Sequence, residues 1–330
     1  MDILVLGGTV FLSRAVAEVA VMHGHSVTAF NRGQSGVPVP GVHTVLGDRT
    51  DPGSLGQLAG RSFDLVFDTG YFADRVQASA RLLEPSVGHY VFTSSISVYP
   101  GWPESADYRA QGSYDGDPDA VGEQVPDDLP EGGSYGWRKV GAERAVLRSF
   151  GEHRAAILRA GCIVGPHDGV GRLPWWLDRI SRGGRTVVPG PPERELRIID
   201  ARDIAEFALK LPVGTFEVTG PEHQVNHQQL FTEARTVTGS DAEFHWVDDQ
   251  VLLDAGVQEW TELPLWAAAA GAPGLWAHDS SEAEAAGLAC RPVMDTLVDT
   301  WDWMRSIPGG WRPSERTPGL SAEQEAALLG

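Results

Sequence analysis

The chain has 330 residues, 42% of them hydrophobic, and a net charge of −19, so it can form one large core or two coupled ones. The acidic surface disfavours nucleic-acid binding, because it repels phosphates over the roughly 8 Å Debye length of physiological salt. Cys162 and Cys290 match no metal-ligand spacing, and no apolar run approaches the roughly 20 residues of a membrane span. The first residues lack signal-peptide features. We therefore expect a cytoplasmic globular protein without a metal, nucleic-acid or membrane partner.

Short apolar runs alternate with helical segments in the N-terminal half. Helical periodicity covers residues 11–23, and strands are expected at residues 3–6, 26–30, 65–68 and 89–93. This alternation predicts the α/β class, with a Rossmann-type doubly wound parallel sheet whose ligands bind at the carboxyl ends of the strands.

Two parts of the chain are expected. The dinucleotide-binding Rossmann domain takes residues 1–164 plus 195–219, and a smaller substrate-binding region takes residues 165–194 plus 220–330. Within the first part, residues 101–134 carry nine carboxylates against one arginine, together with many glycines and prolines. This composition predicts a solvated acidic insertion, to which we assign no chemistry.

A glycine-rich segment, Gly7-Gly8-Thr9-Val10-Phe11-Leu12-Ser13, lies between the first strand and the first helix. Backbone N–H groups and the helix dipole can hold a pyrophosphate there, and Gly7 permits the tight turn. A purely structural strand-to-helix turn is the alternative. The order strand, turn, helix, strand favours the cofactor site.

The second strand ends in Asn31-Arg32-Gly33, without the acidic residue that NAD-preferring enzymes usually offer to the ribose 2′-hydroxyl. Asn31 can hydrogen-bond a ribose or phosphate oxygen, and Arg32, helped by Arg14, can pair with a 2′-phosphate. NADP is therefore favoured over NAD, with an arginine merely solvated at a strand end as the alternative. Asp48 is expected to accept from the adenine amino group, and Asp68-Thr69-Gly70 to lie along the inner side of the cofactor.

Tyr135 and Lys139 lie four residues apart, so they share one face of a helix. A nearby cation and the positive nicotinamide favour phenolate and can bring the pKa of Tyr135 toward neutrality, which suits it to general acid/base catalysis. Ser95, at the end of a hydroxyl-rich strand, can hydrogen-bond the substrate oxygen. The alternative for these serines is to cap backbone groups in a turn.

These residues resemble the extended short-chain dehydrogenase/reductases, often described as NAD-dependent epimerase/dehydratase proteins, and most narrowly a reductase-like bacterial subgroup. The resemblance runs nearly the full length and includes the glycine turn, residues 31–33, Gly47-Asp48, Thr93-Ser94-Ser95 with Tyr99, Tyr135/Lys139, and residues 158–166 and 198–205. Val10 and Ser13 stand where the family has glycine. Ser95-Ile96-Ser97 lacks the neighbouring Asp and Glu of a dehydratase, which disfavours sugar dehydration.

By this resemblance Ser95, Tyr135 and Lys139 form the catalytic triad, and residues 158–166 contain a strand beneath the nicotinamide. The expected cofactor contacts are Gly7, Gly8, Thr9, Val10, Phe11, Leu12, Asn31, Arg32, Asp48, Arg49, Asp68, Thr69, Gly70, Thr93, Ser94, Lys139, Ala160, Cys162 and Ile163.

The substrate side is less clear from sequence. Seven arginines between Gly165 and Asp203 are compatible with an anionic small-molecule substrate, and Arg197 is the best candidate contact. The other expected substrate contacts are Ser97, Tyr99, His167 and Trp175. Trp260 and Trp276 belong to a set of tryptophans that suggests an aromatic lining, although buried tryptophans more often serve packing.

We expect an NADP-dependent oxidoreductase that reduces a carbonyl, or oxidises the alcohol, of a small metabolite, as a monomer or homodimer. One alternative is an epimerase of a nucleotide sugar that uses tightly bound NAD(P) by transient oxidation. A second alternative is a non-catalytic cofactor-sensing or RNA-associated scaffold, which the Tyr135/Lys139 pair and the negative charge disfavour.

Overall fold

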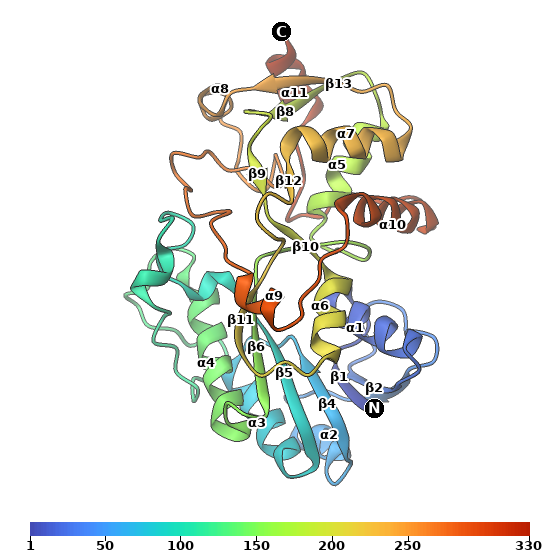
Figure 1. The fold of residues 1–330 in the computed structure, drawn as a ribbon, viewed down its shortest axis with the longest axis vertical. Helices are drawn as coiled ribbons and strands as arrows, with labels where there is room; N and C mark the ends of the chain where they lie inside the picture. Colours follow the sequence, from blue (N-terminus) through green and yellow to red (C-terminus); the bar gives the residue numbers. More distant parts are fainter.

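The structure is a computed structural model that describes residues 1–330, and its centre is a seven-stranded parallel sheet (Figure 1). The strand order is β11-β6-β5-β4-β1-β2-β3. The bounds are β1 (Asp2–Leu6), β2 (Ser26–Asn31), β3 (His43–Leu46), β4 (Phe63–Asp68), β5 (Val87–Ser95), β6 (Ala155–Ala160) and β11 (Gly214–Val218). The predicted doubly wound α/β fold is confirmed. The order reverses between β1 and β4, where open sheets of this kind have their ligand crevice.

Helices cover both faces of this sheet. Successive strand residues face opposite layers, so Ile3 and Val5 pack toward α1 and α6 whereas Leu4 and Leu6 pack toward α3 and α4. The bounds are α1 (Phe11–Met22), α2 (Pro52–Leu55), α3 (Ala73–Leu83), α4 (Gly133–Phe150) and α6 (Ala201–Leu209). The apolar side chains of these helices alternate with polar ones at helical spacing, which is why each helix buries one face.

A second hydrophobic cluster lies above the carboxyl ends of the strands, in the upper part of Figure 1. It is formed by helices and small two-stranded sheets that pair β8 with β13, β9 with β12 and β7 with β10. The bounds are β7 (Cys162–Val164), α5 (Arg172–Ser181), β8 (Arg185–Pro189), β9 (Glu195–Leu196), β10 (Ile198–Asp200), β12 (Val225–Asn226), α7 (His227–Thr238), β13 (Glu243–Val247), α8 (Asp249–Asp254), α10 (Val293–Ser306) and α11 (Ala322–Leu329). The short helix α9 (Ser281–Ala285) instead packs beside β11 of the central sheet. None of the helices combines the length and apolar character needed to cross a bilayer.

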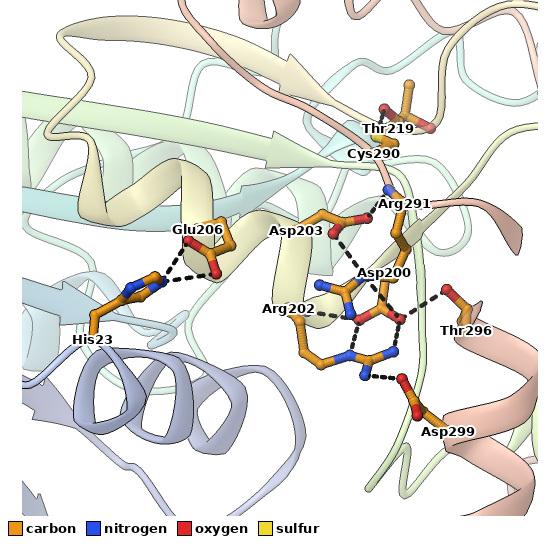
Figure 2. Close-up of polar contacts among 10 residues, drawn as sticks. All are labelled: His23, Asp200, Arg202, Asp203, Glu206, Thr219, Cys290, Arg291, Thr296 and Asp299. Atoms are coloured by element: carbon orange, nitrogen blue, oxygen red, sulfur yellow. Dashed lines mark hydrogen bonds and ion pairs between the residues drawn. The ribbon is translucent and has the colours of Figure 1, made fainter.

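A buried ion-pair network joins α6 to the C-terminal segment (Figure 2). Asp200 caps α6, receives hydrogen bonds from Arg202 at 2.6 and 2.9 Å, and accepts from Thr296 of α10 at 2.8 Å. Arg291 donates to Asp203 at 2.7 Å. Burial opposes ionisation of Asp200, but the hydrogen bonds and charge of Arg202, with the charge of Arg291, outweigh it and lower the pKa of this carboxyl.

The acidic insertion is only partly solvated, in contrast to the expectation from composition. Asp115 and Asp119 pair with Arg144 and Arg148 of α4 at 2.6 and 2.8 Å, which fixes the segment along that helix. Tyr108 is fully buried. The insertion therefore supplies part of the interior beside the sheet.

Candidate active site

Two cavities meet at the start of α1, where both are lined by Val10 and Ser13. The first, called here the glycine-turn cavity, has a volume of about 450 Å³ and lies over the ends of β1, β2 and β3. The second, called here the tyrosine cavity, has a volume of about 700 Å³ and is lined by Tyr135, Lys139 and the end of β5. Their position at the carboxyl ends of the strands matches the ligand crevice of this fold.

The turn after β1 brings backbone N–H groups to the edge of the first cavity. Gly7 and Gly8 have φ angles of +124° and +90°, and a Cβ on Gly8 would lie 2.9 Å from the Cβ of Ala29. Ser13 takes the place of a family glycine without opening the turn, because its buried hydroxyl donates to the carbonyl oxygen of Val10 at 2.9 Å. The turn therefore keeps the close approach that a pyrophosphate needs.

Asn31, a predicted cofactor contact, also has a structural role. Its side-chain amide donates to the carbonyl oxygen of Gly7 at 3.0 Å and accepts from the N–H of Gly33 at 2.9 Å. These bonds tie the end of β2 to the glycine turn. Asn31 also lines the cavity, and its amide has a second N–H and a second lone pair beyond these two bonds.

Arg32 and Arg75 flank Asp48 at the far end of the glycine-turn cavity. Hydrogen bonds from the N–H and hydroxyl of Thr50 lower the pKa of Asp48, and the two arginines contribute to this shift. Arg75 lies on α3 and was missed by the sequence analysis, since no local motif distinguishes it from other helix-face arginines. Two cations in one wall are suited to a phosphate.

Asp68 and Gly70 do not line either cavity, which differs from the expectation that they contact the cofactor. Asp68 is fully buried and receives hydrogen bonds from Arg49 at 2.9 and 2.8 Å, from Tyr90 at 2.7 Å and from the N–H of Gly70 at 2.8 Å. Burial opposes ionisation of Asp68, but Arg49 outweighs it and lowers the pKa. Asp68 therefore anchors the loop after β4, while Thr69 beside it reaches the tyrosine cavity.

Tyr135, Ser95 and Lys139 line the same cavity. Gly136 lets α4 contact the turn after β5 directly, because a Cβ there would overlap the carbonyl oxygen of Ser97. Lys139 is buried, and its ammonium donates to the carbonyl oxygens of Thr93 at 2.7 Å and of Gly70 at 2.8 Å. Its nitrogen lies 5.9 Å from the centre of the Tyr135 ring.

The electrostatics of Tyr135 differ from the sequence-based expectation. Desolvation by the cavity wall raises the pKa of Tyr135, although 42% of this residue remains exposed, and a hydrogen bond with Ser95 and the charges of Arg172 and Arg316 oppose the shift. Burial also lowers the pKa of Lys139 to about 8. The phenol is therefore protonated at neutral pH, as a proton donor requires.

The buried hydroxyls of Thr93 and Ser94 have no hydrogen-bond partner in the protein, and both residues line the tyrosine cavity. Buried polar groups without partners are rare, and a ligand with polar groups would satisfy them. Phe11, Leu12, Ala160, Cys162 and Ile163 complete this wall with mostly apolar surface. Together with the glycine turn, these features fit a dinucleotide that crosses from one cavity to the other.

Four predicted substrate residues lie outside the tyrosine cavity. Trp175 is buried in the C-terminal core against Trp176, and the ring of His167 packs on Trp303 with centroids 5.2 Å apart. Arg197 donates to the carbonyl oxygen of His278, and Tyr99 accepts from Arg159 at 2.9 Å. Of the predicted substrate contacts, Ser97 lines the cavity.

Other residues form the substrate side of the tyrosine cavity. They come from four separate segments and are Trp102, Arg172, Trp260, Leu275, Trp276, His278 and Arg316. The guanidinium of Arg172 lies 5.5 Å from the centre of the Trp260 ring, a cation–π distance. The sequence suggests Trp260 and Trp276 as part of an aromatic lining, whereas no local pattern distinguishes Arg316 or His278.

A doubly wound parallel sheet, a glycine turn after β1, and a Tyr-x-x-x-Lys pair beside a serine-rich strand end define an NAD(P)-dependent enzyme of the extended short-chain dehydrogenase/reductase class. Residues 3–213 match the model of the NAD dependent epimerase/dehydratase family, and the chain belongs to this family. That segment holds the whole central sheet except β11.

Two curated relatives are similar over part of their length. A chloroplast stem-loop binding protein of Arabidopsis thaliana is 32% identical over 113 residues, which cover 29% of this chain and 30% of the relative. A 2-alkyl-3-oxoalkanoate reductase of Stenotrophomonas maltophilia is 31% identical over 228 residues, which cover 63% of this chain and 64% of the relative. The chain thus spans less than two thirds of either one.

Solved structures share the fold over nearly the whole chain. The Bordetella bronchiseptica enzyme WbmH, in complex with NAD⁺, gives a TM-score of 0.62 at 15% identity and covers 93% of this chain and 98% of its own. The UDP-glucose 4-epimerase of Thermotoga maritima with UDP-glucose gives a TM-score of 0.61 at 16% identity. The match covers 92% of this chain and 99% of the epimerase chain. At sequence identities of 15% and 16%, the similarity to these two structures shows a shared fold and nothing further.

Proposed function

We propose that the protein is an NADP-dependent reductase of a small ketone that carries an anionic group. The observation that carries this proposal is the tyrosine cavity, in which a protonated phenol, Tyr135, lies within reach of the charges of two arginines, Arg172 and Arg316. Neither arginine forms an ion pair within the protein, although the net charge is −19. An anionic substrate would pair with them.

Tyr135 donates its proton to the carbonyl oxygen of the substrate while Ser95 holds that oxygen by a hydrogen bond. A bound reduced nicotinamide supplies the hydride. Lys139 keeps a positive charge below the phenol, and its bonds to Gly70 and Thr93 fix α4 against the ends of two strands. The three tryptophans Trp102, Trp260 and Trp276 line the same cavity and supply apolar surface for the substrate.

Arg32 and Arg75 support the preference for NADP. Both line the glycine-turn cavity, and their guanidinium groups can bind a 2′-phosphate at the end of the dinucleotide where Asp48 meets the adenine. No acidic residue follows Asn31 at the place where NAD-preferring enzymes bind the 2′-hydroxyl.

The name of the Stenotrophomonas relative describes a reductase of a ketone with a nearby carboxylate, and this supports the same substrate class here. The test is to identify by mass spectrometry the nucleotide that co-purifies, and then to follow reduced-nicotinamide absorbance with 2-alkyl-3-oxoalkanoates and with their neutral methyl esters. We expect stoichiometric loss of NADPH and a lower KM for the acids. Turnover of a nucleotide sugar without net change in absorbance would instead support the epimerase alternative.

A further inference from the structure

His278 is a buried histidine, 3% exposed, that forms part of the wall of the tyrosine cavity. Its ring packs over the backbone between β6 and β7, since a Cβ on Gly161 would lie 3.3 Å from Cδ2 of His278. The segment that carries it runs beside the acidic insertion, where the N–H of Gly274 donates to the carbonyl oxygen of Pro103 at 2.8 Å (Figure 1).

A chain of hydrogen bonds leads away from this ring into the protein. Nδ1 of His278 lies 3.2 Å from the hydroxyl of Tyr108, which lies 3.0 Å from Oε2 of Glu217 on β11. The N–H of Asp279 donates to the same carboxylate oxygen at 3.1 Å, and Arg109 lies 3.7 Å from it. Oε2 of Glu217 therefore acts as an acceptor for these donors, whereas Oε1 has no hydrogen-bond partner in the protein.

This series of hydrogen bonds determines which nitrogen of the His278 imidazole carries the proton. The single hydroxyl proton of Tyr108 points to Glu217, because two acceptor oxygens 3.0 Å apart would otherwise repel each other. The phenolic oxygen then accepts from His278, so the imidazole proton lies on Nδ1. Burial, with the charges of Arg197 and Arg109, lowers the pKa of His278 to about 3, so the ring carries one proton at neutral pH.

Nε2 of His278 consequently has a free lone pair and no hydrogen-bond partner in the protein. We propose that His278, held in the Nδ1–H form by Tyr108 and Glu217, is a specificity-determining residue that accepts a hydrogen bond from a hydroxyl or amide N–H of the substrate. The inference rests on the proposed reductase function and adds a requirement for a donor group near the reacting carbonyl. A substrate that places an acceptor oxygen next to Nε2 of His278 is disfavoured, because two lone pairs then face each other.

The first experiment measures the tautomer without any substrate. Imidazole nitrogen NMR of the full chain labelled with ¹⁵N-histidine, with His278 assigned by its loss in His278→Asn, should show the proton on Nδ1. Tyr108→Phe removes the oxygen that fixes this proton, and we expect the Nε2–H form to become populated. A proton on Nε2 in the unmutated protein would overturn the inference whatever the activity.

The second experiment compares three ketones with the same anionic chain: a hydroxymethyl, a methyl and a methoxymethyl ketone. We expect kcat/KM with NADPH to be about tenfold higher for the hydroxymethyl ketone than for the other two, the size of one hydrogen bond. His278→Asn keeps a donor toward Tyr108 but has no acceptor at the Nε2 position, so it should abolish the preference. His278→Gln restores an acceptor there and should retain most of it.

The outcomes separate the two proposals. An unchanged preference in His278→Asn, or a change confined to the KM for NADPH, would overturn the role of His278 and leave the reductase function standing. Failure of the unmutated protein to reduce any ketone would overturn the reductase function, and the NMR result alone would then decide whether His278 presents an acceptor to the cavity.

Discussion

The ammonium nitrogen of Lys139 lies 2.7 Å from the carbonyl oxygen of Thr93. This contact joins α4, which carries Tyr135, to the end of β5, which carries Ser95. Lys139 is the only lysine that lines the tyrosine cavity, and its burial lowers its pKa to about 8. The charge beneath the phenol therefore depends on pH in an accessible range.

The pH dependence of reduction should follow this lysine. Lys139 is protonated below about pH 8 and neutral above it, whereas Tyr135, with its raised pKa, keeps its proton across that range. We expect kcat/KM for reduction to fall as the pH rises through about 8. Replacing the exposed Lys210 by Met is the matched control and should leave the profile unchanged. A profile flat up to pH 10 would contradict the assignment.

Tyr135→Phe removes the proton donor and little else. We expect kcat to fall by about 10²–10⁴-fold, while NADPH binding measured by fluorescence stays within about twofold. Tyr71 is a suitable control because its ring lies 5.8 Å from that of Tyr135 but does not line the cavity. Tyr71→Phe should retain nearly full activity, and equal activity of both variants would refute the role of Tyr135.

Arg32→Ala and Arg75→Ala should each weaken NADP binding by about tenfold or more and NAD binding much less. The reason is that a charged hydrogen bond to the 2′-phosphate is lost only with NADP. Arg81→Ala, on the exposed end of the same helix as Arg75, controls for the change in net charge. Calorimetric titration with both dinucleotides measures the effect. Equal losses for NAD and NADP would exclude a contact with the 2′-phosphate.

Arg316→Ala should raise the KM for an anionic ketone by about tenfold and leave the KM for its methyl ester nearly unchanged, because one charged contact is removed. Arg312→Ala is the matched control, since Arg312 is exposed, lies four residues away and does not line the tyrosine cavity. Steady-state kinetics with both substrates gives the answer. Parallel effects on acid and ester would show that Arg316 does not bind the anion.

Asp200→Asn should destabilise the protein by about 1–3 kcal/mol at neutral pH, because the partly buried guanidinium of Arg202 loses its charged partner at Asp200 and keeps only the ion pair with Asp299. The pKa of Asp200 is lowered by folding, so its contribution is present above the ordinary carboxyl pKa of about 4 and is lost as the pH falls through the lower folded value. The difference in the free energy of unfolding between the variant and the unmutated protein should therefore become smaller at acidic pH. Asp299→Asn, at the half-exposed end of the same network, should cost less than about 1 kcal/mol in chemical denaturation.

Local patterns along the chain are sufficient to predict the sheet, the glycine turn and the pairing of Tyr135 with Lys139. These features depend on spacing within one element: alternation in strands, four-residue spacing in a helix, and glycines at a strand-to-helix turn. The predicted strand at residues 65–68 is part of β4, and the helix predicted from residue 11 begins at Phe11.

The set of side chains that meet in the tyrosine cavity depends on packing between distant segments and cannot be derived from local patterns. Arg197 immediately precedes the strand that leads to Asp200, and Trp175 belongs to the set of tryptophans that suggests an aromatic lining, but packing of α5 buries Trp175 and a backbone oxygen binds Arg197. Arg316 and His278 reach the cavity from segments more than 100 residues beyond Tyr135. Spacing decides which residues share a face of one helix or strand, whereas the partner of that face is decided by contacts between distant segments.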